Sequence, residues 1–203
     1  MDAKRTNVIL LEVLNGIMIN VFIIHGAYGN PRENWFPWLK KDLGGMGCEV
    51  FLPAFPTPEN QSLESWISVF SDYERRLDGD SIVVGHSLGV AFLLNVLEKR
   101  EKEPIKAAFL VAGFTGALND PRFDRINKTF TDRRFDWKKI RKHCRKFFVF
   151  SSDNDPYVPL LKGKELAKNL GAEMILVKNA GHFNEKSGYV KFELLLENIK
   201  KEI

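Results

Sequence analysis

The sequence predicts a single α/β domain built around an open parallel sheet, and three observations support this class. Six short apolar runs recur along the chain, most of them nearly continuous, as expected for strands that are buried on both faces. Segments with helical spacing separate these runs. The chain has 203 residues, of which 44% are hydrophobic, enough for one sizeable core but short for two ordinary domains. We therefore expect a three-layer α/β/α sandwich with ligands at the carboxyl ends of the strands.

The predicted elements alternate from strand to helix six times. The apolar runs that predict strands cover residues 20–24, 49–52, 81–84, 107–112, 147–150 and 173–177. The intervening helical segments cover residues 33–45, 61–77, 87–100, 136–144, 159–171 and 189–203. Several helices carry their own boundary signals, because Ser62 can cap the start of the second and Gly171 can end the fifth.

Residues 18–203 are expected to form the domain, with residues 1–17 as an N-terminal extension. The strand pattern "MINVFIIHG" begins at Met18, so the preceding residues are either an extension from an upstream start codon or an extra helix over a sheet edge. The start resembles a secretory signal, but Glu12 and Asn15 interrupt its apolar run and no small-residue cleavage site follows.

The composition narrows the class of protein further. No run of 18 apolar residues is present, so a membrane-spanning helix is not expected. The two cysteines lie in neither a disulfide framework nor a pattern with metal-ligand spacing. We expect a cytoplasmic protein in a reducing compartment, with no metal and no organic cofactor.

The pentapeptide "GHSLG" at residues 85–89 joins an apolar strand to a helix. In that context G-x-S-x-G is typical of a nucleophile elbow, a strained turn that lifts the serine hydroxyl above the sheet. Gly85 and Gly89 lack side chains that would collide with the neighbouring strand and helix. The turn also aims the backbone N–H of Leu88 at an oxyanion beside the serine. The pattern predicts Ser87 as a nucleophile.

A serine nucleophile needs a base and an orienting acid, which on such a sheet follow in the order serine, acid, histidine. Of the four histidines, only His182 has this order and follows a predicted strand. Two acids, Asp153 and Asp155, follow the strand before it. We favour Asp155, because Pro156 biases it toward an extended conformation that can reach His182. Asp153, the alternative, can instead form a turn with nearby backbone.

A second oxyanion donor is expected from the loop "HGAYGN" after the first strand. The backbone N–H of Ala27 is the candidate, and that of Tyr28 is the runner-up. The flanking glycines are compatible both with this role and with a merely tight loop.

Together these motifs resemble the α/β-hydrolase superfamily, and within it the small serine hydrolases that include retinoblastoma-binding protein 9. The resemblance runs from Met18 to the C-terminus and rests on "HGAYGN", "GHSLG", "FDWKKI", "SDNDPYVP" and "GHF". It implies a catalytic triad of Ser87, Asp155 and His182. It also implies a compact α/β-hydrolase fold of about six parallel strands in the order 2-1-3-4-5-6.

The substrate pocket is less clearly indicated. Only residues 113–145 are available for a lid, and part of them must form a helix, so no large cap domain is expected. Loop positions suggest five pocket candidates, for each of which core packing remains the alternative: Tyr28, Trp35, Phe114, Tyr157 and Phe183. For Trp35, as for Trp38 and Trp66, helical spacing among apolar neighbours favours the core.

Positive charge is concentrated in one segment. Between Arg122 and Lys146 there are eleven Lys or Arg against three Asp, whereas the whole chain carries a net charge of +4. These charges can steer an anionic substrate. A solvated helix face is the favoured alternative, and nucleic-acid binding is a weak third because no nucleic-acid module accompanies the cluster.

The function predicted from these residues is acyl transfer to water on small carboxylic esters, through an acyl-enzyme on Ser87. Thioester and peptide or amide substrates fit the same machinery. A protein-binding module that kept the fold without catalysis is the competing class. The sequence specifies no protein partner and indicates no membrane association.

Overall fold

The computed structural model describes residues 18–203, so the predicted extension at residues 1–17 lies outside the described part of the chain. The strands are β1 (Asn20–Ile24), β2 (Glu49–Phe51), β3 (Ile82–His86), β4 (Ile105–Val111), β5 (Cys144–Ser152) and β6 (Glu173–Val177). They form one parallel sheet in the order β2-β1-β3-β4-β5-β6. This confirms the predicted fold class and strand order.

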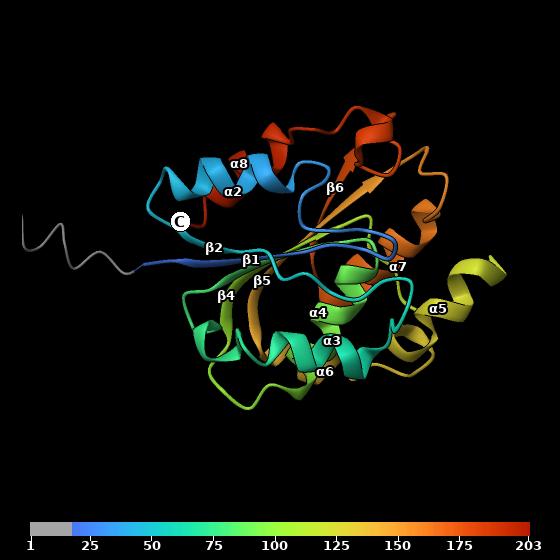
Figure 1. Cartoon of the computed structure of the whole chain (residues 1–203), viewed down its shortest axis with the longest axis horizontal. Helices are drawn as coiled ribbons and strands as arrows, with labels where there is room; N and C mark the ends of the chain where they lie inside the picture. The colour runs from blue at the N-terminus through green and yellow to red at the C-terminus, as the bar shows by residue number, and fades with distance from the viewer. Residues whose placement is uncertain (1–17) are drawn as a thin grey trace, which may run out of the picture.

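Helices cover both faces of the sheet (Figure 1). They are α2 (Phe36–Gly44), α3 (Leu63–Phe70), α4 (Leu88–Lys99), α5 (Pro121–Thr131), α6 (Trp137–Lys142), α7 (Leu160–Leu170) and α8 (Glu193–Lys200). On one face lie α2 and α8, while α3, α4, α6 and α7 pack on the other. Two short 3-10 turns, Glu74–Arg76 and Glu185–Ser187, lie in connections.

Each face of the sheet has its own apolar core. Trp66 of α3 and Phe92 of α4 are fully buried on one face, where their rings make an edge contact at 5.5 Å. On the opposite face Trp35 and Phe36, at the start of α2, are equally buried. The core positions predicted for Trp35 and Trp66 are therefore confirmed, whereas Trp38 is only partly buried.

The connection between β4 and β5 holds α5 and α6 but no large cap domain. Pro121 occupies the first turn of α5, and the Asp120 side chain accepts a hydrogen bond from the backbone N–H of Arg122 at 2.9 Å. This is a standard N-terminal helix signal. Two residues of this helix, Phe123 and Asn127, become part of the site described below.

Over the described range, no helix combines the length and apolar character needed to cross a membrane. Nor does any group of three His, Cys, Asp or Glu side chains in residues 18–203 come together as a metal site would require.

Candidate active site

Ser87 lies on the turn between β3 and α4 with φ 54° and ψ −121°, a conformation that is strained for a residue with a side chain. Its backbone N–H donates to the Val111 carbonyl at 2.9 Å, which ties the turn to β4. A Cβ at Gly89 would lie 2.5 Å from the Ile24 carbonyl oxygen, so the helix can approach the sheet only without a side chain there. The local geometry is that of a nucleophile elbow.

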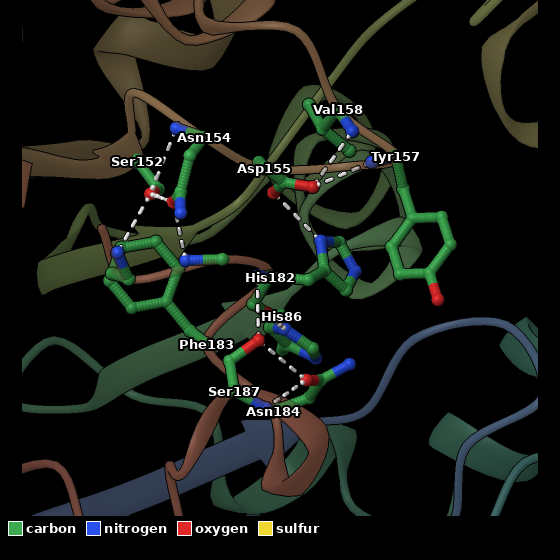
Figure 2. A network of polar contacts seen from close by, with 12 residues as sticks. His86, Ser152, Asn154, Asp155, Tyr157, Val158, His182, Phe183, Asn184 and Ser187 are labelled. Carbon is green, nitrogen blue, oxygen red and sulfur yellow. Dashed lines mark hydrogen bonds and ion pairs between the residues drawn. The ribbon is translucent and has the colours of Figure 1, made fainter. Parts of the chain in front are cut away.

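Asp155 and His182 face each other, and His86, the residue before Ser87, lies close to them (Figure 2). Asp155 Oδ2 lies 2.8 Å from His182 Nδ1, and the other carboxylate oxygen accepts the backbone N–H groups of Tyr157 and Val158 at 2.8 and 3.0 Å. The Asp155 side chain is 2% exposed. Because an ionised carboxylate only accepts hydrogen bonds, it favours the tautomer with the proton on Nδ1, which leaves Nε2 free to act as a base.

The residues before Asp155 hold the loop that carries His182. The side chains of Ser152, Asp153 and Asn154 accept hydrogen bonds from the backbone N–H groups of residues 179–181 at 2.8 to 3.1 Å. We call these contacts the loop clasp; Ser152 and Asn154 are drawn in Figure 2. The structure therefore brings Asp155 to the imidazole, whereas Asp153 binds backbone.

His86, the residue before Ser87, contacts the loop that carries His182, and sequence reasoning missed this contact. Its Nε2 lies 2.8 Å from the carbonyl oxygen of His182, and the two rings are 4.8 Å apart. Since a carbonyl can only accept, His86 carries its proton on Nε2. Burial, with a smaller contribution from the charge of His182, lowers the pKa of His86 to about 3. His86 is therefore a neutral donor that fixes the backbone of His182.

Acid should destabilise the fold through His86. Its pKa in the folded protein lies below the ordinary 6.5, so the unfolded state takes up the proton first as the pH falls from about 6.5 toward 3. At about pH 5 this lowers the free energy of unfolding by about 2 kcal/mol. Urea denaturation measures the free energy of unfolding at about pH 7.5 and about pH 5. The decrease between these two pH values should be smaller in His86→Gln than in the wild type, by this amount. An equal drop in both proteins would contradict the expectation.

Two backbone N–H groups close to Ser87 have no backbone partner among the described residues. Leu88 is the first residue of α4, so its N–H has no intrahelical partner, and within residues 18–203 none is seen for Ala27 either. A Cβ at Gly26 would lie 2.8 Å from Ser87 Cβ, which shows how closely this loop approaches the elbow. The runner-up, Tyr28, donates its N–H to Thr57 Oγ1 at 2.7 Å. The geometry therefore favours Ala27.

Ser87, His182 and Ala27 line one pocket of about 370 Å³. Three of the five aromatic candidates line it, namely Tyr28, Phe114 and Tyr157. Further lining residues are Gly26, Ala27, Gly29, Glu33, Asn34, His86, Ser87, Leu118, Phe123, Asn127, Val158, His182, Asn184, Glu185 and Lys186.

The other two aromatic candidates belong to the core, so their assignment to the pocket is corrected. Trp35 and Phe183 are both 0% exposed and pack on the α2 and α8 face of the sheet. The Trp35 indole N–H donates to the Phe183 carbonyl at 2.9 Å. Their loop positions placed them near the site, but the direction of a side chain does not follow from a loop position.

Sequence reasoning also missed the wall supplied by α5 and its preceding loop, where Leu118, Phe123 and Asn127 line the pocket. The Phe123 ring makes edge contacts with Tyr28 at 6.0 Å and with Tyr157 at 5.7 Å. The available signal was the spacing of Phe123, Asn127 and Phe130, which puts the three residues on one side of a helix.

The basic segment is divided between the pocket and more remote parts of the fold. Arg122 lies over the ring of Phe123, which lines the pocket, with its guanidinium carbon 5.9 Å from the ring centroid. By contrast, Arg141 lies near the start of β5, beside Arg145. The strands begin at this end of the sheet, whereas Ser87 lies at the end where they finish. Among the described lining residues, the positive charge of Lys186 is balanced by two acidic residues, Glu33 and Glu185. The pKa of Glu33 is raised, mainly by burial and also by the charge of Glu185. The wall therefore does not present an excess of positive charge to a substrate.

Comparisons with known proteins identify the family of the chain. A family model described as "Serine hydrolase" matches residues 21–201. The protein YdeN of Bacillus subtilis (strain 168) is 32% identical over 178 residues, covering 87% of this chain and 92% of YdeN. The crystal structure of YdeN matches with a TM-score of 0.86 and 31% identity, covering 91% of this chain and 98% of that one.

Further matches are more distant. The serine hydrolase RBBP9 of Rattus norvegicus is 28% identical over 152 residues, covering 74% of this chain and 78% of RBBP9. Est1E from Butyrivibrio proteoclasticus, in a structure with ferulic acid bound, shares the fold with a TM-score of 0.65 and 18% identity, each chain being covered to 92%. With the family model spanning nearly the whole described chain, this protein belongs to the serine hydrolase family.

Proposed function

We propose that this hydrolase cleaves small carboxylic esters, with Ser87 as nucleophile, His182 as general base and Asp155 as the group that orients the base. The observation that carries the proposal is the 2.8 Å contact between Asp155 and His182 Nδ1, in a pocket that Ser87 also lines. A hydroxyl, an imidazole and a carboxylate in this setting form the triad of acyl-transfer enzymes.

The proposed reaction proceeds through an acyl-enzyme. His182 Nε2 accepts the hydroxyl proton as Ser87 Oγ attacks the substrate carbonyl, and the resulting oxyanion is held by the N–H groups of Leu88 and Ala27. The protonated His182 then delivers its proton to the leaving alcohol. Water, activated by the same imidazole, attacks the acyl-enzyme and restores Ser87. Asp155 holds the ring and stabilises its charged form throughout.

The pocket favours small and uncharged substrates. Its volume of about 370 Å³ is near the lower end of the range for ligand sites. Phe114, Leu118 and Phe123 provide apolar wall, while Glu33 and Glu185 disfavour an anionic group despite Lys186. Thioesters and amides suit the same triad; esters are the first choice because their leaving groups make the fewest demands on a site without a large lid.

Covalent labelling with a fluorophosphonate tests the proposal. Such a probe reacts with activated serines, so we expect stoichiometric labelling that mass spectrometry places on Ser87, and prior treatment with acid denaturant should abolish it. A panel of short acyl esters, their thioesters and their anilides would then rank the substrate classes. A folded wild-type protein that neither labels nor cleaves any of the panel would favour the non-catalytic binding module instead.

A further inference from the structure

Asn127 is a polar residue in an otherwise largely apolar part of the pocket wall. It lies within α5, lines the pocket near Leu118 and Phe123, and is only 2% exposed. A buried amide needs hydrogen-bond partners for both its oxygen and its amino group. Its surroundings therefore determine what it can offer to a substrate.

The Asn127 oxygen already has a partner, Gln61. This residue is the last donor in a chain of hydrogen bonds that begins at Tyr28, in the loop after β1. The Tyr28 N–H donates to Thr57 Oγ1 at 2.7 Å, and the Thr57 hydroxyl in turn donates to Gln61 Oε1. Gln61 Nε2 then donates to the Ile126 carbonyl at 2.9 Å and to Asn127 Oδ1 at 3.1 Å.

The direction of this chain is fixed at both ends. The backbone N–H of Tyr28 can only donate, so Thr57 must pass its own hydroxyl proton onward to the Gln61 oxygen. The backbone carbonyl of Ile126 can only accept, so the Gln61 amino group faces α5. Asn127 must therefore turn its oxygen toward Gln61 and its amino group away from it.

The Asn127 amino group is left as a donor. Over residues 18–203 no partner is seen for Nδ2, and Nδ2 is not among the fully enclosed side-chain atoms there that lack a hydrogen bond. Nδ2 therefore keeps an opening to solvent, and the space that Asn127 lines is the pocket. The nearby wall residues Phe114, Leu118 and Phe123 carry no side-chain acceptor that could satisfy it.

We propose that Asn127 is a specificity-determining residue that selects substrates with a neutral hydrogen-bond-accepting oxygen, such as an ether, hydroxyl or ketone, apart from the scissile carbonyl. This rests on the proposed ester hydrolysis and adds the substrate class. An apolar substrate leaves the Asn127 amino group covered and unpaired, whereas an oxygenated substrate satisfies it.

Pairs of substrates that differ in one atom test this selection. The 4-nitrophenyl esters of 3-methoxypropanoate and pentanoate, and of 4-methoxybutanoate and hexanoate, exchange an ether oxygen for a methylene at two depths. The readout is the ratio of kcat/KM, ether over alkyl, in each protein. In Asn127→Leu, which keeps the shape but removes the donor, we expect the ratio of at least one pair to fall about 10-fold.

Two further variants separate this role from a structural one. Asn127→Asp presents a carboxylate oxygen instead of a donor and should also lower the ratio. It replaces the leucine variant as the test if that variant does not fold. Gln61→Glu leaves Asn127 in place but turns its amino group toward the new carboxylate, with the same expected fall. Thr129→Val is the control, because Thr129 is exposed on α5 and its Oγ1 accepts the Leu63 N–H outside the pocket.

The outcomes distinguish this inference from the function beneath it. If wild type cleaves the alkyl esters and neither ratio changes in any folded Asn127 variant, the role of Asn127 is wrong and ester hydrolysis stands. If wild type cleaves no ester of either kind, the proposed function fails and the selection falls with it. An equal fall in Thr129→Val would also overturn the assignment.

Discussion

Replacing Ser87 by alanine is expected to lower kcat by about 10⁶-fold for every ester that the wild-type protein cleaves. In the proposed mechanism the change removes the atom that forms the acyl-enzyme and leaves His182 and Asp155 without a partner for proton transfer. The Ser87 side chain does not cap α4 with a hydrogen bond, so thermal unfolding should shift little. Steady-state kinetics and a melting curve on the same preparation measure both quantities.

A matched serine makes this result specific. Ser71→Ala removes a hydroxyl that donates to the Ser68 carbonyl at 2.7 Å, at the end of α3 and outside the pocket. It should retain wild-type kcat. Hydrolysis by Ser87→Ala at the wild-type rate would place the nucleophile elsewhere and overturn the mechanism.

The second large effect is expected from Asp155→Asn, with a fall in kcat of about 10⁴-fold. An amide beside Nδ1 can donate to the ring and stabilise the tautomer with the proton on Nε2, which cannot accept a proton from Ser87. The asparagine oxygen can still accept the N–H groups of Tyr157 and Val158, so the loop should keep its shape.

Asp153→Asn is the matched control, because it makes the same chemical change two residues away. Its remaining oxygen can still accept the Asn179 N–H, a contact of 2.8 Å in the wild type. Its kcat should therefore stay close to wild type. A larger loss in Asp153→Asn than in Asp155→Asn would reassign the acid.

The sequence predicts the sheet well because its strands are short apolar runs with polar borders. The bounds of β1 and β6 agree with the prediction, while β5 extends beyond it at both ends. Its first residues, Cys144 to Lys146, join the sheet by pairing with β4, and Ser151 and Ser152 by pairing with β6. Such pairing depends on a neighbouring strand rather than on hydrophobicity, so the apolar pattern did not show it.

The site was predictable where chain order and backbone geometry determine it, and not where side-chain direction does. The elbow at Ser87 follows from glycine spacing, and His182 follows from its place after the last strand. By contrast, the donor role of His86 depends on the loop opposite it, and Asn127 reaches the pocket from a helix about forty residues further along. These contacts join segments that are distant in sequence. The spacing of Phe123, Asn127 and Phe130 indicates a helix face, but a local pattern cannot show that this face lies at the pocket.

Because of the loop clasp, the loops that contain residues 152–154 and 179–181 have to be changed together in protein engineering. Three adjacent acceptors in residues 152–154 match three adjacent donors in residues 179–181, so an insertion in either loop would put all three contacts out of register at once. A chimera that takes only one loop from a relative would contain either the acceptors or the donors of the clasp, but not both. Exchange of residues 152–187, which include α7, would transfer Asp155 and His182 together with the contacts that align them.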